Sequence, residues 1–255
     1  MKRNFILKIA RLISIPWLFL PFKLRKLLFT IFFIIESRGD DPRKGLMSLF
    51  LIKDNIDWVI NERALKYGLG IHPKHSLMKY HDFFISTIKD GSKVLDVGCG
   101  IGMVSMNVAK KLTKSSIIGI DINKKNIMQA NELLNKSNLK NVKFIYGDIN
   151  DQKDINAEYV ILSNVLEHIE NRTKFLKNIQ KITKSKIFLI RVPNFERDWQ
   201  IAMRKELGIY YFSDVDHKIE HTADQLKIEL ERSGFTIKEI FTVWGEIWVE
   251  CEYGL

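Results

Sequence analysis

The sequence predicts an α/β fold with a mainly parallel sheet, and three observations lead to it. A glycine-rich loop at 98–102 follows a short apolar segment and precedes apolar residues at helical spacing. Further short apolar segments come after it, at 117–121, 141–146 and 159–162. Two final segments, 235–243 and 246–253, are separated by Trp244-Gly245 and predict an antiparallel hairpin at the end of the chain.

The first strand and its loop read VLDVGCGIG, beginning at Val94. Three glycines remove side chains where this strand ends: Gly98, Gly100 and Gly102. A strand, a glycine loop and a helix in this order bring backbone N–H groups and a helix N-terminus against a nucleotide-like ligand. A dinucleotide fingerprint, G-x-G-x-x-G/A, needs a small residue at position 103, where this chain has Met103.

The acidic residues after these strands follow a recognisable order. The loop that begins at Asp96 reads D-x-G-x-G-x-G and resembles motif I of the class I S-adenosyl-L-methionine (SAM)-dependent methyltransferases. Asp121 ends the next strand 25 residues later, close to the interval of about 20 residues at which a second strand carries the acid that holds a ribose diol. The run Gly147-Asp148-Ile149 resembles the motif whose acid meets the adenine amino group.

The fourth strand is followed by Ser-Asn-Val-Leu-Glu-His-Ile at 163–169. This run resembles the corresponding motif of the ubiquinone-biosynthesis-like and polysaccharide-modifying branches of the family. The resemblance implies a Rossmann-like seven-stranded class I methyltransferase sheet with a terminal antiparallel hairpin, and SAM as the cofactor.

The resemblance also assigns roles to particular residues. Asp96 is expected at the methionine end of SAM, directly or through water, and Asn164 on the same side. Asp121 is expected to bind the ribose hydroxyls and Asp148 the adenine amine. The full set of expected cofactor-binding residues is Asp96, Gly98, Cys99, Gly100, Asp121, Ile122, Asp148, Ile149 and Asn164.

The basic character of the chain belongs mainly to its N-terminal segment. Residues 1–35 carry seven of the lysines and arginines and no acidic residue, so the net charge of +10 leaves only +3 for residues 36–255. A nucleic-acid partner is therefore not expected. The uncharged runs at 12–22 and 27–35 are shorter than the roughly 18–20 residues of a spanning helix. They favour two short helices lying in a membrane interface, with Pro16 and Pro21 breaking the first run.

The next region, 36–90, is expected to form a helical cap. Its polar start, 36–45, predicts a linker or turn, and 46–67 predicts a helix that Gly68 ends. A second helix is expected from an N-cap at Ser76 through Ile88. In the family that this chain resembles, the segment before the first strand often lies over the cofactor, so Tyr80 and His81 are candidate site residues.

Residues 194–221, after a predicted fifth strand at 186–192, form an irregular and aromatic-rich insertion. Its place at the carboxyl edge of the sheet is typical of an acceptor pocket. His217 and His221 are candidate general bases, because histidine titrates near neutrality. His168 is the third candidate, and a mechanism that relies on positioning without a base stays open.

Two cysteines, Cys99 and Cys251, predict neither a disulfide framework nor a metal site and suit a reducing cytoplasm.

Taken together, these features predict a membrane-peripheral basic segment (1–35), a helical cap (36–90) and a methyltransferase domain (91–255). The expected enzyme lies at the inner membrane surface and O-methylates a lipid, a lipid-linked sugar or a cell-surface glycan precursor. Two alternatives remain: a soluble small-molecule methyltransferase with a dimerising N-terminal arm, and a non-catalytic SAM-binding regulator. The oligomeric state stays open.

Overall fold

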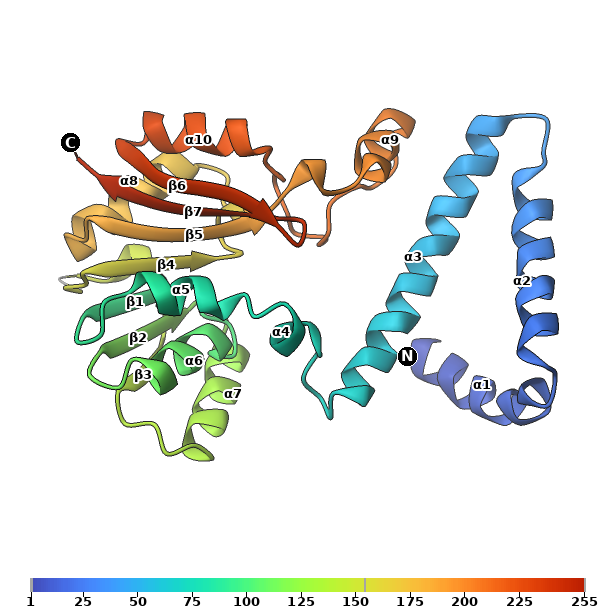
Figure 1. The fold of residues 1–255 in the computed structure, drawn as a ribbon, viewed down its shortest axis with the longest axis horizontal. Coiled ribbons are helices and arrows are strands. Elements are labelled where there is room, and N and C mark those ends of the chain that lie inside the picture. The colour runs from blue at the N-terminus through green and yellow to red at the C-terminus, as the bar shows by residue number, and fades with distance from the viewer. Residues whose placement is uncertain (1, 154, 255) are drawn as a thin grey trace.

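A mixed seven-stranded sheet forms the core of the part of the protein that follows the N-terminal helices (Figure 1). The structure is a computed structural model that describes residues 2–153 and 155–254. The strands lie in the order β3 (Val142–Tyr146), β2 (Ser116–Asp121), β1 (Lys93–Val97), β4 (Tyr159–Ser163), β5 (Ile187–Pro193), β7 (Glu246–Tyr253) and β6 (Phe235–Val243). β1 to β5 pair in parallel, and β7 runs antiparallel to both β5 and β6. The predicted sheet with its terminal hairpin is confirmed.

Helices cover both faces of the sheet, which explains why its central strands are apolar runs. α5 (His81–Thr87) and α6 (Met103–Lys111) pack with Val94 and Ile161 on one face, and α7 (Lys124–Asn135) reaches this core through Leu134. α8 (Arg172–Thr183) and α10 (Ala223–Arg232) pack with Leu95 and Leu162 on the other. Alternate residues of each strand thus enter opposite cores.

The carboxyl ends of β1, β2, β3 and β4 meet at one edge of the sheet. In β1, Val97 pairs with Ile120 of β2 and Leu162 of β4. The loops that follow these strands are therefore neighbours, although they are far apart in the chain. This register brings the four sequence motifs to a common edge.

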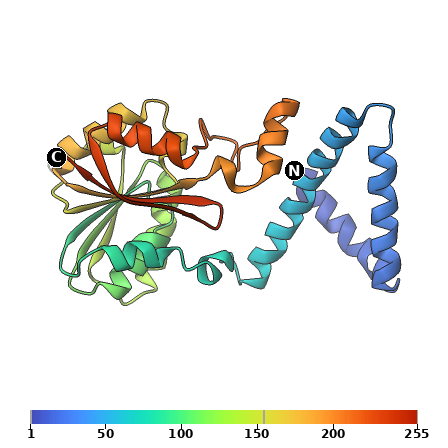
Figure 2. The ribbon, with the colours of Figure 1, turned by 45° about the horizontal axis from the view of Figure 1, so that its top comes forward.

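Three N-terminal helices form an arm that stands beside the sheet domain (Figures 1 and 2). α1 (Lys2–Leu18) is followed by α2 (Phe22–Ser37) and α3 (Pro42–Tyr67), and α2 lies antiparallel to α3. Pro16 lies inside α1, so the expected break there is wrong, whereas Pro21 does precede the start of α2. Within the described residues, no helix combines the length and the apolar character needed to cross a bilayer.

The cap region differs from the sequence prediction at two places. The expected linker at 36–45 shrinks to 38–41, because the Asp41 side chain caps α3 by accepting hydrogen bonds from the Arg43 and Lys44 N–H groups. The expected single helix from Ser76 is wrong. Two short helices, α4 (Lys74–Leu77) and α5, are separated at Lys79, which adopts a positive φ of 48°.

The insertion at 194–221 contains more regular structure than the sequence predicts. A 3-10 turn, η3 (Phe195–Arg197), leads into α9 (Trp199–Leu207). The Arg204 guanidinium on α9 lies 2.7 Å from the Asp54 carboxylate on α3, and Arg43 donates to the Leu207 carbonyl at 3.1 Å. The arm is therefore attached to the insertion by charged contacts.

Candidate active site

The glycine loop is held against the end of β2 by its own backbone. The Gly98 and Cys99 N–H groups donate to the Ile120 carbonyl at 2.8 and 3.1 Å, and the Gly100 N–H donates to the Asp121 carboxylate at 2.8 Å. A Cβ on Gly98 would lie 2.7 Å from a Val165 methyl group, whereas one on Gly100 would meet open space. The loop therefore packs tightly against Val165 at Gly98 and leaves open space beside Gly100.

A cavity lies between this loop and the ends of β2 and β3. It is lined by five of the nine residues that the sequence assigns to the cofactor: Gly98, Asp121, Ile122, Asp148 and Ile149. Sequence reasoning missed other lining residues, among them Val165, Ile169 and Phe175. Val165 and Ile169 directly flank the Leu-Glu-His run. Their place beside this motif could have identified them as lining residues.

The acidic residues of the cavity suit a ligand rich in hydroxyl and amino donors. Asp121 accepts hydrogen bonds from Gly100 N–H and, at 2.7 Å, from Asn123 N–H, one on each oxygen. Asp148 accepts two bonds from Asn150 on a single oxygen, at 2.8 and 2.9 Å. A carboxylate oxygen has two lone pairs, so both side chains keep acceptor capacity. These residues fit the ribose and adenine groups of SAM.

Asp96 lies outside the residues that line this cavity. Its side chain is buried and accepts a hydrogen bond from the Ser105 hydroxyl of α6 at 2.5 Å. Burial raises the pKa of Asp96 to about 7, and the bond from Ser105 offsets only part of that rise. Asp96 thus joins β1 to α6, and its contact with the methionine end of SAM stays a prediction.

The raised pKa predicts a pH-dependent stability for the wild-type protein. Between the ordinary pKa of 3.8 and the folded-state value of about 7, the folded protein binds more protons at Asp96 than the unfolded chain does. The free energy of unfolding should therefore fall as pH rises through this window, by up to about 1.4 kcal/mol per pH unit. Asp96→Asn should lose this contribution. Urea unfolding at pH 5, 6 and 7 measures the free energy of unfolding of both proteins. The same dependence of this free energy on pH in wild type and Asp96→Asn would contradict the prediction.

Cys99 and Asn164 occupy constrained positions near the loop. Burial raises the pKa of the Cys99 thiol, which makes it a poor nucleophile and leaves it a packing role. Asn164 follows β4 with a positive φ of 57°, a conformation that asparagine tolerates better than most residues. Its N–H donates to the Arg191 carbonyl at 2.8 Å.

Tyr80 and His81 pack against the last part of the sheet, outside the residues that line the cavity. The Tyr80 ring centroid is 4.2 Å from the Arg191 guanidinium carbon, and Arg191 also pairs with Glu246 at 3.0 Å. Burial lowers the pKa of His81 to about 4, so this imidazole is neutral at physiological pH. Their contact with the cofactor stays a prediction.

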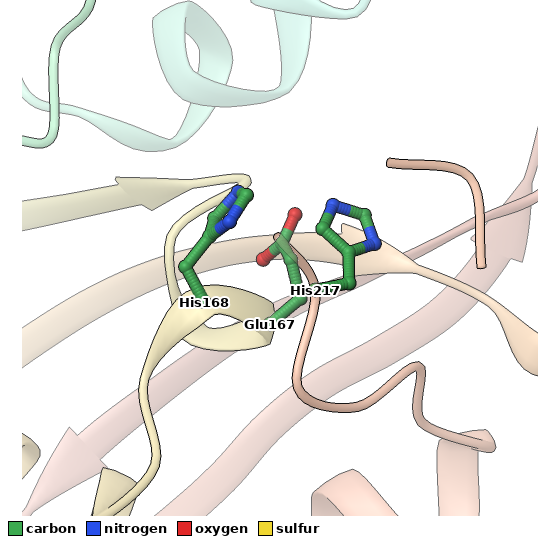
Figure 3. Close-up of side chains that lie close together, drawn as sticks. All are labelled: Glu167, His168 and His217. Atoms are coloured by element: carbon green, nitrogen blue, oxygen red, sulfur yellow. The ribbon is translucent and has the colours of Figure 1, made fainter. Parts of the chain in front are cut away.

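Two of the three candidate base histidines meet beside a buried glutamate (Figure 3). The rings of His168 and His217 are edge to face, with centroids 4.7 Å apart. Glu167 lies with them and is fully buried, and this burial raises its pKa to about 8. Sequence analysis missed Glu167, although it stands inside the Leu-Glu-His run.

His217 and His221 have different surroundings. His217 Nδ1 lies 3.1 Å from a carboxylate oxygen of Glu220. His221 is buried, and its Nε2 lies 3.4 Å from Glu229 on α10, which also pairs with Arg172 at 2.6 Å. The His221 ring therefore belongs to a network that joins the insertion to α8 and α10.

Comparison with known proteins places this architecture in a family. The family model described as a methyltransferase domain matches residues 88–245. The ribosomal protein L11 methyltransferase of Thermotoga maritima is 27% identical over 142 residues, which cover 56% of this chain and 51% of that protein. The chain thus spans about half the length of the curated relatives it matches.

Solved structures share the fold at low sequence identity. A SAM-dependent methyltransferase from Aquifex aeolicus superposes with a TM-score of 0.55 at 18% identity, over 73% of this chain and 95% of that one. The magnesium protoporphyrin IX methyltransferase from Synechocystis PCC 6803, solved with bound SAH, gives 0.57 at 16% identity, over 71% and 83%. The matched domain and the sheet order agree, so this chain belongs to the methyltransferase domain family and has the SAM-dependent class I fold.

Proposed function

We propose that this protein works at the inner surface of the cytoplasmic membrane and transfers the methyl group of SAM to a hydroxyl group. The acceptor is a lipid, a lipid-linked sugar or a cell-surface glycan precursor. The observation that carries this proposal is the N-terminal arm, which exposes bulky apolar side chains among lysines and arginines and contacts the insertion beside the site.

The chemistry requires alignment of the acceptor more than covalent participation by the protein. SAM supplies an electrophilic methyl group on a sulfonium. Asp121 and Asp148 would hold its ribose and adenine, and the open side of Gly100 lets the ligand approach the backbone. Alignment of this kind contributes on the order of 7–11 kcal/mol to catalysis. The cluster of Glu167, His168 and His217 stands beside the cavity and is positioned to activate a hydroxyl nucleophile.

The arm has the composition of a membrane-binding surface. None of the residues of α2 is buried, and the helix exposes apolar side chains along its length: Phe22, Leu24, Leu27, Phe29, Ile31, Phe32, Ile34 and Ile35. Phe19, between α1 and α2, is 84% exposed. Lys23, Arg25 and Lys26 lie at the start of α2, and the side chains of Lys2, Arg3, Phe5 and Lys8 fall outside the described residues. Apolar side chains interleaved with cations favour an interfacial position on anionic lipid.

The connection between arm and insertion links this surface to the acceptor side of the sheet. Arg204 on α9 is buried, pairs with Asp54 of α3 and lies over the Phe50 ring. α9 and the His217 segment belong to the same insertion, which begins directly after β5. A membrane-bound arm would therefore hold the acceptor pocket close to the lipid surface, which favours a lipid-linked acceptor.

Removing three arm cations should weaken membrane binding strongly. Each cation near an anionic surface contributes about 1 kcal/mol, so a full-length variant with Lys23, Arg25 and Lys26 replaced by glutamine should bind anionic vesicles up to ~100-fold more weakly. Sedimentation with vesicles that contain phosphatidylserine measures this. The matched control replaces three exposed lysines of the sheet domain, Lys110, Lys111 and Lys114, and should bind like wild type.

The same sedimentation experiment distinguishes the competing interpretation of the arm. If the arm forms a dimer interface, the wild-type chain should not bind the vesicles at low salt and should sediment as a dimer free of lipid. That result would overturn the membrane assignment and the main reason for a lipid-linked acceptor.

A further inference from the structure

We propose that Glu167, His168 and His217 bind one divalent transition-metal cation, and that this cation holds the hydroxyl oxygen of the acceptor. The inference deepens the proposed function and rests on it for the identity of the acceptor as a hydroxyl compound. It departs from the sequence analysis, which expected no metal site.

The three side chains provide a suitable set of ligand atoms. One ligand atom from each lies within 4.8 Å of the others, and Figure 3 shows the Glu167 carboxylate between the two imidazole rings. In a tetrahedral zinc site, bonds of about 2.0–2.2 Å to nitrogen or oxygen place the ligand atoms about 3.3–3.6 Å apart. Small side-chain rotations therefore suffice to close the site. Two imidazoles and one carboxylate are typical of zinc and of other first-row transition metals.

Glu167 is the observation that points to a cation. Its side chain is fully buried, and neither carboxylate oxygen has a well-formed hydrogen bond among the described residues. The Asn164 side chain offsets only part of the effect of this burial. An ionised carboxylate is costly to bury without partners, so such groups are protonated, paired with a cation or bound to a metal. The backbone holds this residue in place, because Lys218 N–H donates to the Glu167 carbonyl at 2.7 Å. That bond also fixes the segment that carries His217.

His217 has the surroundings of a metal-binding histidine. Its Nδ1 faces Glu220, which leaves Nε2 as the ring nitrogen available to a metal. Glu220 is itself buried, pairs with Arg197 and accepts a hydrogen bond from the Ser213 hydroxyl at 2.8 Å. Metal-bound histidines usually donate their second N–H to a carboxylate, which fixes the tautomer and the ring orientation. The His168 Nδ1 lies 3.2 Å from an Asp216 carboxylate oxygen but forms no hydrogen bond with it.

The position of the cluster explains what a cation would do there. Glu167 and His168 lie on η2 (Leu166–His168), between Val165 and Ile169, which both line the cofactor cavity. Three protein ligands leave coordination positions open, as in catalytic metal sites. An acceptor hydroxyl bound there has a lowered pKa and releases its proton to solvent. Its oxygen then forms a bond to the methyl carbon while the carbon–sulfur bond breaks and its electron pair returns to sulfur.

Metal binding can be measured without turnover. Calorimetric titration of the full-length, chelator-treated protein with ZnCl₂, and electron paramagnetic resonance with MnCl₂, should each show one saturable site. Glu167→Gln keeps the shape of the side chain and should weaken binding at least tenfold. Glu220→Gln leaves all three ligands in place and should weaken it by about 10–100-fold. His72→Ala, which replaces a half-buried histidine in another part of the chain, is the matched control and should bind like wild type.

Calorimetry with SAM on the same samples separates the two proposals. Saturable metal binding that Glu167→Gln weakens supports the site. Absence of a saturable metal site, or equal metal affinity in wild type and Glu167→Gln, overturns it while SAM binding persists. A wild-type protein that fails to bind SAM would instead remove the proposed function.

Discussion

Turnover by the His217→Ala protein is expected to fall about 100-fold or more, with SAM affinity close to that of wild type. His217 lies beside Glu167 and His168 and is oriented by Glu220, so its loss removes a group that we propose to activate the acceptor hydroxyl. It lies outside the residues that line the cofactor cavity. Turnover of SAM with the true acceptor, together with calorimetric SAM titration, measures the two effects separately.

The matched control for this prediction is His221→Gln. His221 is four residues away, and its ring contacts Glu229 within the network that joins α8 and α10. Glutamine preserves a hydrogen-bonding group there, so this variant should retain turnover near the wild-type value. Equal turnover in His217→Ala and wild type would show that the activating group lies elsewhere or that alignment alone suffices.

Asp121→Ala is expected to weaken the binding of SAM and of S-adenosylhomocysteine ten- to hundredfold. The loss of a hydrogen bond to a charged group costs about 1.5–3 kcal/mol, which corresponds to this range. Asp121 also accepts the Gly100 N–H, so its removal loosens the glycine loop against β2. Both effects act in the same direction on cofactor affinity, which calorimetry measures directly.

A matched aspartate variant shows whether this loss is specific. Asp224 is exposed in the first turn of α10, outside the cavity, and Asp224→Ala should bind SAM like wild type. Equal SAM affinity in Asp121→Ala and wild type would remove Asp121 from the ribose role. Binding of NAD without binding of SAM would contradict the cofactor assignment as a whole.

The sheet could be predicted because its signals are local. Each strand is a short apolar run with a turn or a carboxylate at its end, and the hairpin turns at Trp244 and Gly245, both with positive φ. The capping box of Thr222 and Gln225 at the start of α10 is equally local, because it depends only on residues three positions apart. Five of the expected cofactor residues meet in one cavity for a similar reason, since parallel strands bring their carboxyl ends to one edge.

The cluster around Glu167 could not be predicted from local patterns. Glu167 and His217 are far apart in the chain and meet only because the insertion folds back and Lys218 N–H binds the Glu167 carbonyl. The sequence also did not predict the break between α4 and α5. Lys79 has a positive φ at this break, and lysine is not a residue type that indicates a positive φ. The contact between α9 and α3 depends on Arg204 and Asp54, a pairing set by tertiary structure.

The most direct test of the proposed function follows the methyl group itself. The full-length protein is incubated with methyl-labelled SAM and a total cell extract that retains its membranes, and the products are partitioned into lipid and aqueous phases. The expected result is enzyme-dependent label in the lipid phase, with S-adenosylhomocysteine formed in equal amount and both reduced in the Asp121→Ala protein. Label confined to the aqueous phase, or no transfer by a protein that binds SAM, would contradict the account.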